Sequence, residues 1–195
     1  MKINSNTKII GSKTILVPYR EYHVPNRYHN WMQSEELQQL TASQPLSLDE
    51  EYDMQKSWRE DEDKCTFIIL DKSIYESKND EITSMIGDTN IFMTDKDNSI
   101  GEIEIMIAEK SALGKRFGWE SVIIMMLYGI KFVNIKIFEA KISYSNVVSI
   151  NMFKKLGFVE KSRSDMFEEI TFHKIVTEDW VEWLDQQIRW EIENC

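Results

Sequence analysis

Residues that interrupt or loosen a chain are scarce in this sequence. Its 195 residues include three prolines and seven glycines, and no stretch is rich in either. A flexible or extended linker needs such a stretch, so we expect one domain over residues 1–177. An amphipathic helical tail over residues 178–195 follows, with Trp180, Trp183 and Leu184 at helical spacing. We expect this tail to pack on the domain; binding to a partner is the alternative.

Cysteine and histidine are also rare. Cys65 lies in an apolar run and Cys195 ends the sequence, so the two form neither a disulfide framework nor a pair of metal ligands. The histidines, His23, His29 and His173, are scattered and have no partner carboxylate at ligand spacing. We expect no metal site.

Long apolar runs are missing as well. The longest, Val122–Tyr128, is far shorter than the roughly 18 residues that cross a bilayer. Residues 1–13 contain no apolar segment of the kind found in a secretory signal. We therefore expect a cytoplasmic or nuclear protein.

Positive charge is in the minority. Lys and Arg number 23 against 33 Asp and Glu, which gives a net charge of −10. This balance argues against a nucleic acid or an anionic membrane as partner. An acidic protein attracts cations such as a lysine side chain or a free α-amine. Acidity also keeps proteins soluble, whatever their substrate.

The hydrophobic periodicity predicts a mixed α/β domain. Strands are expected at residues 13–20, 64–71, 81–94, 100–107 and 136–143, from 158, and within 165–177. Helices are expected at residues 24–33, 118–130, 146–155 and 177–193, and two further helices are expected to begin at residues 34 and 47. Ser47 and Glu50 have the spacing of a capping box, and residues 72–80 read as a polar turn. Early hairpins and one late crossover are typical of a mixed sheet flanked by helices.

Residues 100–130 join a strand to a helix through a loop that contains glycines. Ile103, Ile105 and Ile107 alternate as in a strand, and an apolar helix follows the loop at 108–118. Free N–H groups and the helix dipole at such a helix start favour an anion. The pattern therefore predicts a phosphate or pyrophosphate site, although it is neither a Walker A loop nor G-x-G-x-x-G. An ordinary structural crossover is the alternative.

A second pattern follows the strand at residues 136–143. Asn146, Ser149 and Phe153 recur at intervals of three and four and so share one helical face. Gly157 then ends the helix and turns the chain into the next strand. Asn146 is therefore expected at the carboxyl end of one strand and the start of a helix, facing a crevice.

This second pattern, N-x-x-S-x-x-x-F-x-K-x-G-F, resembles motif B of the GCN5-related N-acetyltransferases (GNAT), and residues 103–130 look like their motif A. The resemblance extends over the whole chain. The segments LVPYREYHVPNRYHNWM, SEELQQLTASQPLSLDEEYDMQKSW, EDEDKCTFIILD and IFEAKI are similar to the N-acetyltransferase 9-like branch. The long N-terminal segments among them identify this branch more specifically than motif A alone does.

The resemblance implies a mostly antiparallel GNAT sheet, splayed open between the strands at 100–107 and 136–143, with acetyl-CoA in the gap. The loop N–H groups would bind the pyrophosphate, and the first of these strands would pair with the pantetheine arm. The residues that it assigns to the cofactor are Ile105, Met106, Ile107, Leu113, Gly114, Lys115, Arg116, Phe117, Gly118, Asn146 and Phe153.

The same resemblance implies acetyl transfer to a protein amine, either a lysine side chain or an N-terminus, by direct attack. Glu104 is the candidate to accept the amine proton, through water, and a backbone N–H from Ile105 to Ile107 would bind the oxyanion. Ser149 is the nearest hydroxyl that could relay a proton to the thiolate; a structural serine is the alternative. Side chains near the acceptor are expected from residues 24–45 and from the turn between the last two strands.

Three positions depart from the family pattern. Leu113 and Arg116 occupy positions that the family usually fills with Arg or Gln and with Gly, and Phe153 replaces a frequent Tyr. Either Arg116 compensates with its charge, or the loop holds a pyrophosphate less well. A catalytically weak binding or scaffold protein is therefore the alternative function. Members of this branch are linked to microtubules, so tubulin is the partner that the resemblance suggests.

A kinase is disfavoured because no Mg²⁺-binding acid follows the loop.

Overall fold

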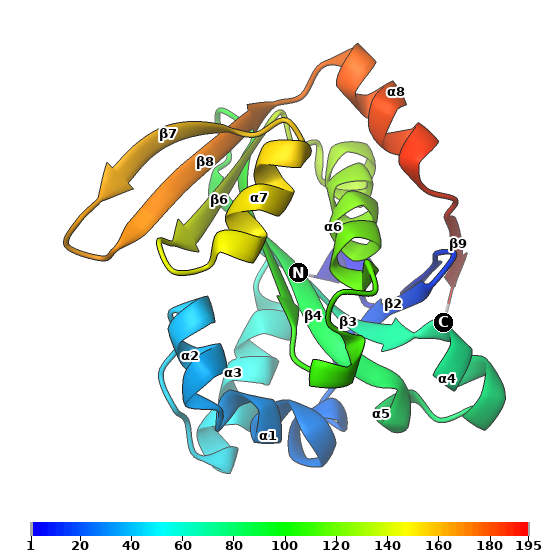
Figure 1. The fold of residues 1–195 in the computed structure, drawn as a ribbon. Coiled ribbons are helices and arrows are strands. Elements are labelled where there is room, and N and C mark those ends of the chain that lie inside the picture. Colours follow the sequence, from blue (N-terminus) through cyan, green and yellow to red (C-terminus); the bar gives the residue numbers. More distant parts are fainter. Residues whose placement is uncertain (1, 195) are drawn as a thin grey trace.

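The computed structural model describes residues 2–194, and nine strands within this range form one sheet. Their order is β7–β8–β6–β5–β4–β3–β2–β1–β9 (Figure 1). The strands are β1 (Thr7–Ile10), β2 (Thr14–Pro18), β3 (Lys64–Asp71), β4 (Met85–Asp95), β5 (Ile100–Ile107), β6 (Ile137–Ser143), β7 (Val159–Ser164), β8 (Glu169–Ile175) and β9 (Glu191–Asn194). Within the described chain, β5 and β6 are the one parallel pair. The predicted mixed, mostly antiparallel sheet is confirmed.

The sheet opens between β5 and β6. Ile100–Glu102 pair with Ile137–Glu139, and within the described residues the two strands share no further pairs. Beyond this point β5 continues along β4 to Ile107, and β6 continues along β8 to Ser143. Alternate N–H and C=O groups of the far half of β5 therefore face the gap rather than another strand. The predicted splay is confirmed.

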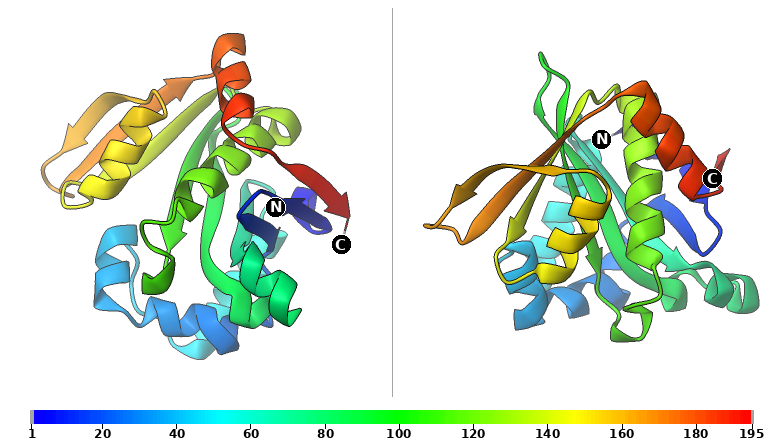
Figure 2. Two further views of the ribbon diagram at one scale, coloured as in Figure 1. Left: turned by 45° about the vertical axis from the view of Figure 1, so that its right-hand side comes forward. Right: turned by 45° about the horizontal axis from the view of Figure 1, so that its top comes forward.

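Helices cover both faces of this sheet. They are α1 (His29–Met32), α2 (Glu35–Thr41), α3 (Leu48–Glu60), α4 (Lys72–Lys78), α5 (Glu81–Ser84), α6 (Phe117–Tyr128), α7 (Val147–Lys155) and α8 (Glu178–Gln187). Single helical turns of 3₁₀ or π type form η1 (Lys2–Asn4), η2 (Val24–Tyr28), η3 (Lys110–Ala112) and η4 (Gly129–Val133). Figures 1 and 2 show α6 and α7 on one face and α1–α3 on the other. None of the helices in residues 2–194 has the length and apolar content needed to cross a membrane.

Alternation along the strands divides the core between these two layers. Leu16 and Phe67 belong to the cluster that packs on α6, α7 and α8. Their neighbours Val17 and Ile68 belong to the cluster beneath η2, α1 and α3. Successive side chains of a strand point to opposite faces, so both faces of β2 and β3 are buried. This explains why these segments are apolar without interruption.

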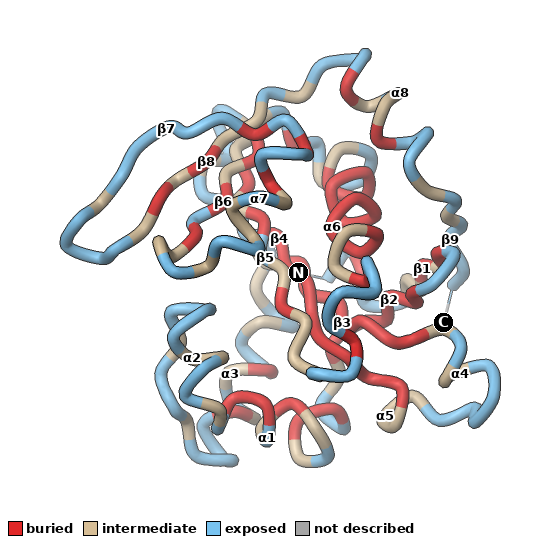
Figure 3. The backbone as a smooth tube through the Cα atoms, in the orientation of Figure 1, coloured by how far each residue is buried: buried red, intermediate tan, exposed pale blue. Residues whose placement is uncertain are grey.

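Helix α6 is the central helix of the fold and is buried nearly throughout (Figure 3). Its Glu120 is 5% exposed. The Glu120 carboxylate accepts hydrogen bonds from the N–H groups of Ser12, Lys13 and Thr14 at 3.0, 2.8 and 2.8 Å. A buried carboxylate with several N–H partners is stabilised as the anion. Glu120 thereby joins α6 to the turn between β1 and β2.

The connection from β3 to β4 differs from expectation. Residues 72–80, expected as a polar turn, contain α4, because the Asp71 carboxylate accepts from the N–H groups of Ser73 and Ile74 and caps that helix. The strand expected from residue 81 begins at Met85, after α5, which Asp80 caps. Opposite Gly87 and Met85, the β3–β4 register shifts between Ile69 and Leu70.

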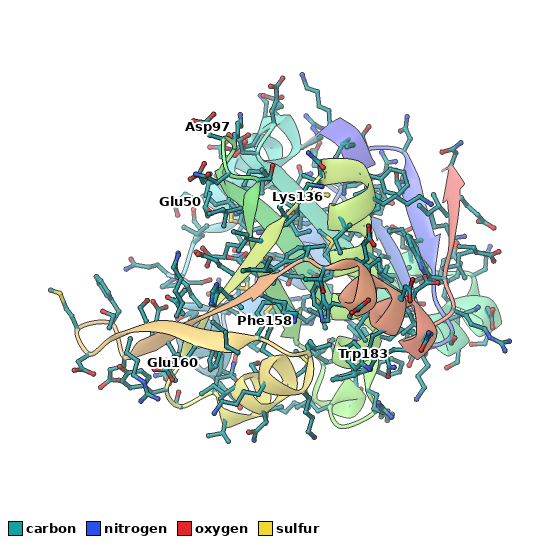
Figure 4. The ribbon with its side chains drawn as sticks, turned by 90° about the horizontal axis from the view of Figure 1, so that it is seen from above. Glu50, Asp97, Lys136, Phe158, Glu160 and Trp183 are labelled. Carbon is teal, nitrogen blue, oxygen red and sulfur yellow. The ribbon has the colours of Figure 1, made fainter. Side chains whose placement is uncertain are left out.

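The two ends of the chain also differ from expectation. The last helix, expected to reach residue 193, ends at Gln187, and β9 follows it. Strand β9 pairs with β1, which the periodicity did not reveal either. Trp180 and Leu184 of α8 are buried, and the Trp183 ring meets Trp119 of α6 edge-on at 6.5 Å between ring centroids (Trp183 is labelled in Figure 4).

Candidate active site

The gap between β5 and β6 leads into a cleft of about 830 Å³. Ile103 and Ile105 of β5 line it from the α6 side of the sheet, while Glu104 and Met106 line it from the α1–α3 side. Since the sheet is parted here, groups from both faces meet in one space. Two substrates that approach from opposite faces can therefore come into contact.

The second sequence pattern lies on the wall opposite β5. Asn146, Ser149 and Phe153 all line the cleft, as predicted. Asn146 is the N-cap of α7, and its side-chain oxygen accepts from the N–H of Ser149 at 3.1 Å. The capping bond uses the oxygen, and the amide NH₂ is the donor that this side chain still carries. Phe153 is 2% exposed and packs edge-on against Phe158, with 5.0 Å between ring centroids (Phe158 is labelled in Figure 4).

The glycine loop has the backbone of an anion site. Gly114 and Arg116 have φ angles of +75° and +69°, and Arg116 is the N-cap of α6 without a side-chain capping bond. The first N–H groups of α6 are therefore not capped by this side chain. Arg116 adopts a left-handed conformation that usually requires glycine, which explains why the family places Gly there. Its guanidinium lies 5.5 Å from the ring centre of Trp119, outside the cleft lining.

The structure does not bring all the predicted residues together. Gly114, Lys115, Arg116 and Phe117 line a separate hollow of about 580 Å³, together with Lys13 and residues 71–73. Within the described chain, the predicted residues Ile107, Leu113 and Gly118 line neither hollow. The loop and the cleft are adjacent parts of one strand–loop–helix unit, because β5 borders the cleft and leads directly into the loop.

Acidic side chains gather at the floor of the cleft. Asn90 donates from its side-chain amide to Glu104 Oε2 at 2.6 Å. Asp88, 9% exposed, lies in β4 on the same face, and burial followed by the nearby Glu104 charge raises its pKa to about 7. Burial also raises the pKa of Glu102, while its ion pair with Lys141 lowers it in part. This floor favours a cation.

Several of these cleft residues were not predicted from the sequence. They are Trp58, Lys64, Asp88 and Glu102. One signal was available, since Asp88 is a charged residue within the segment 81–94, which the periodicity predicts to be a strand. A charged residue in the middle of a buried strand is rare without a partner or a function. The expected contributions from residues 24–45 and from the last turn are found, in Met32, Gln39–Ser43 and Phe167–Glu169.

A sheet that parts between two parallel strands, with an uncapped helix start behind one of them, is the architecture of the GNAT acetyltransferases. The sequence profile of that family, described as "Acetyltransferase (GNAT) domain", matches residues 13–159. The chain therefore belongs to the GNAT acetyltransferase family, in its N-acetyltransferase 9-like branch, and is an N-acetyltransferase.

Relatives support this assignment over nearly the full length. The chain is 49% identical over 193 residues to "Alpha/beta-tubulin-N-acetyltransferase 9" of Drosophila melanogaster, covering 96% of each chain. The Homo sapiens protein of the same name is 50% identical over 190 residues, which cover 96% of this chain and 92% of that protein. The "N-acetyltransferase 9-like protein" of Nematostella vectensis is 53% identical over 173 residues, 88% of this chain and 87% of the relative.

Solved structures support the fold. Spermidine N-acetyltransferase from Vibrio cholerae, in complex with CoA and spermine, superposes with a TM-score of 0.72 at 15% identity, covering 84% of this chain and 96% of that one. The ribosomal L7/L12 alpha-N-protein acetyltransferase RimL gives 0.70 at 16% identity, over 86% and 95% of the two chains. The binding or scaffold alternative is not better supported than acetyl transfer.

Proposed function

We propose that the protein transfers the acetyl group of acetyl-CoA to a protein amine, either a lysine side chain or an N-terminus, by direct attack in a ternary complex. The observation that carries this proposal is the cleft at the parting of β5 and β6, which is lined from both faces of the sheet. One substrate can reach it along the α6 side and the other along the α1–α3 side. No covalent enzyme intermediate is then needed.

The residues on the α6 side suit acetyl-CoA. The uncapped start of α6 and the left-handed Gly114 and Arg116 present N–H groups to a pyrophosphate. The exposed backbone edge of β5 suits the amides of pantetheine, and Asn146 supplies an amide donor from the facing wall. Spermidine N-acetyltransferase, which shares the fold, was solved with CoA. Acetyl-CoA as co-substrate is thus consistent with the residues present.

The acidic floor on the α1–α3 side suits an amine, which arrives at neutral pH as an ammonium ion. Two relatives with about half of their residues identical are named as tubulin N-acetyltransferases, which makes tubulin our candidate substrate. A cytoplasmic or nuclear location accords with such a substrate. The cleft mouth, between the C-terminal end of α2 and the β7–β8 turn, is exposed and can receive a protein segment.

Chemistry at the cleft requires three groups. A carboxylate removes the amine proton; the prediction from sequence gives this role to Glu104, and both Glu104 and Asp88 line the cleft. A β5 N–H in the range Ile105–Ile107 stabilises the oxyanion as the amine attacks. Ser149 also lines the cleft and is our candidate to relay a proton to the thiolate, because Phe153 has no hydroxyl to supply one.

Transfer to tubulin tests the proposal directly. Purified tubulin heterodimer is incubated with the protein and isotopically labelled acetyl-CoA, and mass spectrometry locates the label. A library of peptides with free N-termini and internal lysines, treated in the same way, distinguishes the two classes of amine. Asn146→Ala is the matched loss-of-function variant. Labelling of neither tubulin nor any peptide by the wild-type protein would contradict the proposal.

A further inference from the structure

We propose that Asp88 takes the proton from the acceptor amine and that Glu104 beside it holds the incoming ammonium ion. This assignment rests on the proposed function and identifies the amine subsite within it. It differs from the prediction from sequence, which gave proton removal to Glu104.

The first observation is the burial of Asp88 without a partner. Asp88 is 9% exposed, and its Oδ1 atom has no hydrogen-bond partner among the described residues. Buried carboxylates are normally paired, because water has been removed from a charged group. Asp88 lies among the residues that line the cleft. Oδ1 itself is shielded from solvent, so an amine approaches this carboxylate from the cleft side, which Asp88 lines.

The second observation is the position of Glu104 relative to Asp88. In the β4–β5 register Asn90 faces Glu104 and Asp88 faces Met106, so Asp88 and Glu104 are diagonal neighbours on one face. Asn90 donates to Glu104 at 2.6 Å, and its own side-chain oxygen accepts from the Thr66 hydroxyl at 3.0 Å. This chain of hydrogen bonds orients the Glu104 carboxylate at the edge of the cleft.

The other titratable groups around Asp88 come from β3, α3 and the segment after β2. Lys64 lowers the pKa of Asp88 in part, and its ammonium lies 3.9 Å from the ring centre of Trp58. The pKa values of Tyr19 and Tyr28 are raised well above the usual range, first by burial, so both phenols are neutral. Glu51 of α3, whose pKa burial also raises to about 7, does not line the cleft, so Asp88 is the carboxyl that combines this pKa with a place in the cleft lining.

Asp88 and Glu104 differ in burial, so the two carboxylates can take different roles in acid–base chemistry. Burial first, and then the Glu104 charge, raise the pKa of Asp88 to about 7, near the operating pH at which a general base is most effective. Glu104 is exposed and hydrogen-bonded, so its carboxylate attracts the substrate cation from solvent. An amine that binds between them is held by one group and deprotonated by the other.

The proton and electron pairs balance in this scheme. An N–H bond of the ammonium breaks, its proton goes to Asp88, and the freed lone pair attacks the thioester carbonyl carbon. The C–N bond forms, and the C–S bond then breaks with its electron pair on sulfur. The second proton lost from nitrogen goes to that thiolate, and Asp88 releases the first proton to solvent. One ammonium ion and one thioester give one amide, one thiol and one proton.

Asp88→Asn is the variant that tests the assignment, with Glu51→Gln as its control. Glu51 is 1% exposed, its pKa is also raised to about 7 by burial, and it does not line the cleft. The amide introduced by Asp88→Asn keeps the shape of the side chain without a basic oxygen. We expect Asp88→Asn to lower kcat on the order of 100-fold or more, with an unchanged Kd for acetyl-CoA by calorimetry. Glu51→Gln retains wild-type kcat.

Two readouts separate proton removal from a structural role. In the wild-type protein we expect kcat/KM to rise with pH as Asp88 loses its proton, and to reach a plateau above about pH 7. In Asp88→Asn we expect this rise to be absent, and the residual kcat/KM to follow the fraction of the acceptor amine that is already deprotonated in solution. A less basic acceptor amine, which is already deprotonated, restores much of the variant's rate. Wild-type kcat with the same rise with pH in Asp88→Asn would overturn the assignment, as would a loss that the less basic amine does not reduce.

Failure of the proposed function gives a different result. If the wild-type protein acetylates no amine, both the proposed function and the role assigned to Asp88 are rejected. If the wild-type protein is active and Asp88→Asn is equally active, acetyl transfer stands and the role of Asp88 alone is rejected.

Discussion

Lys141 of β6 forms an ion pair with Glu102 of β5, 2.6 Å apart, close to where the two strands separate. The Glu102 side chain is 12% exposed and that of Lys141 is 46% exposed. The pair thus crosses the start of the gap. Its position suggests that it holds the strands at a fixed separation while leaving the far halves apart.

Removal of Lys141 leaves Glu102 buried without its cation. We expect Lys141→Met to lower the unfolding free energy by about 1–3 kcal/mol, because an unpaired buried acceptor has lost its water without gaining a partner. The double variant Glu102→Gln/Lys141→Met should recover most of this loss. Chemical denaturation of the four proteins in a double-mutant cycle measures the coupling. Equal stability of the single variant and the wild type would show that solvent replaces the lysine.

Acetyl-CoA should stabilise the folded protein. At a free ligand concentration about ten times the Kd, binding to the native state alone raises the unfolding free energy by about 1.4 kcal/mol. A thermal-shift titration with acetyl-CoA, and with desulfo-CoA as a control that keeps the pyrophosphate, measures this effect. No shift at millimolar ligand would argue against an acetyl-CoA site in the loop and cleft.

Arg116→Gly tests the unusual loop. The left-handed conformation at φ +69° costs a non-glycine residue about 1 kcal/mol, and glycine removes that strain. We expect tighter acetyl-CoA binding by calorimetry, because glycine lacks the Cβ that hinders close approach of the loop backbone to the pyrophosphate, despite loss of the contact between Arg116 and Trp119. Arg116→Lys, which keeps a charge and the strain, is the matched control. Weaker binding in Arg116→Gly and retained binding in Arg116→Lys would instead make Arg116 a phosphate ligand.

Local signals explain what could be predicted from the sequence. The capping box of Ser47 and Glu50 and the positive φ of Gly157 both occur as expected, because each depends on residues a few positions apart. The spacing of Asn146, Ser149 and Phe153 likewise predicted the position of Asn146, whereas the splay of the sheet was predicted from the resemblance to a known family.

Features that depend on distant partners could not be predicted in the same way. Strand β9 is formed by its pairing with β1 at the opposite end of the chain. The burial of Asp88 depends on helices far away in the sequence that cover β4, and burial is what separates it chemically from Glu104. Helix α4 was missed because its cap, Asp71, is the last residue of a strand.

Stability should depend on pH through the buried carboxyls. The pKa of Asp88 is raised from 3.8 to about 7 in the folded protein, and that of Glu51 from 4.5 to about 7. Their neutral forms are favoured by folding, so this contribution is complete below about pH 4 and is lost as the pH rises to about 7. We expect Asp88→Asn to be more stable than the wild type at about pH 8, by on the order of 2–4 kcal/mol, and equally stable at about pH 4. Urea denaturation at both pH values tests this, and equal stability at both would contradict the burial of a charge at Asp88.

Glu120 should be far more important for stability than an exposed acid. In Glu120→Ala the N–H groups of residues 12–14 lose their acceptor inside the protein, so we expect a loss of about 3–5 kcal/mol in the unfolding free energy. Glu60→Ala, at a side chain 58% exposed, is the control and should change stability by less than about 0.5 kcal/mol. Hydrogen exchange gives the local readout, because the amides of residues 12–14 should lose protection in Glu120→Ala before the rest of β2. Retained protection there, with near wild-type stability, would show that α6 and the β1–β2 turn are held together by apolar packing, and that the carboxylate is dispensable.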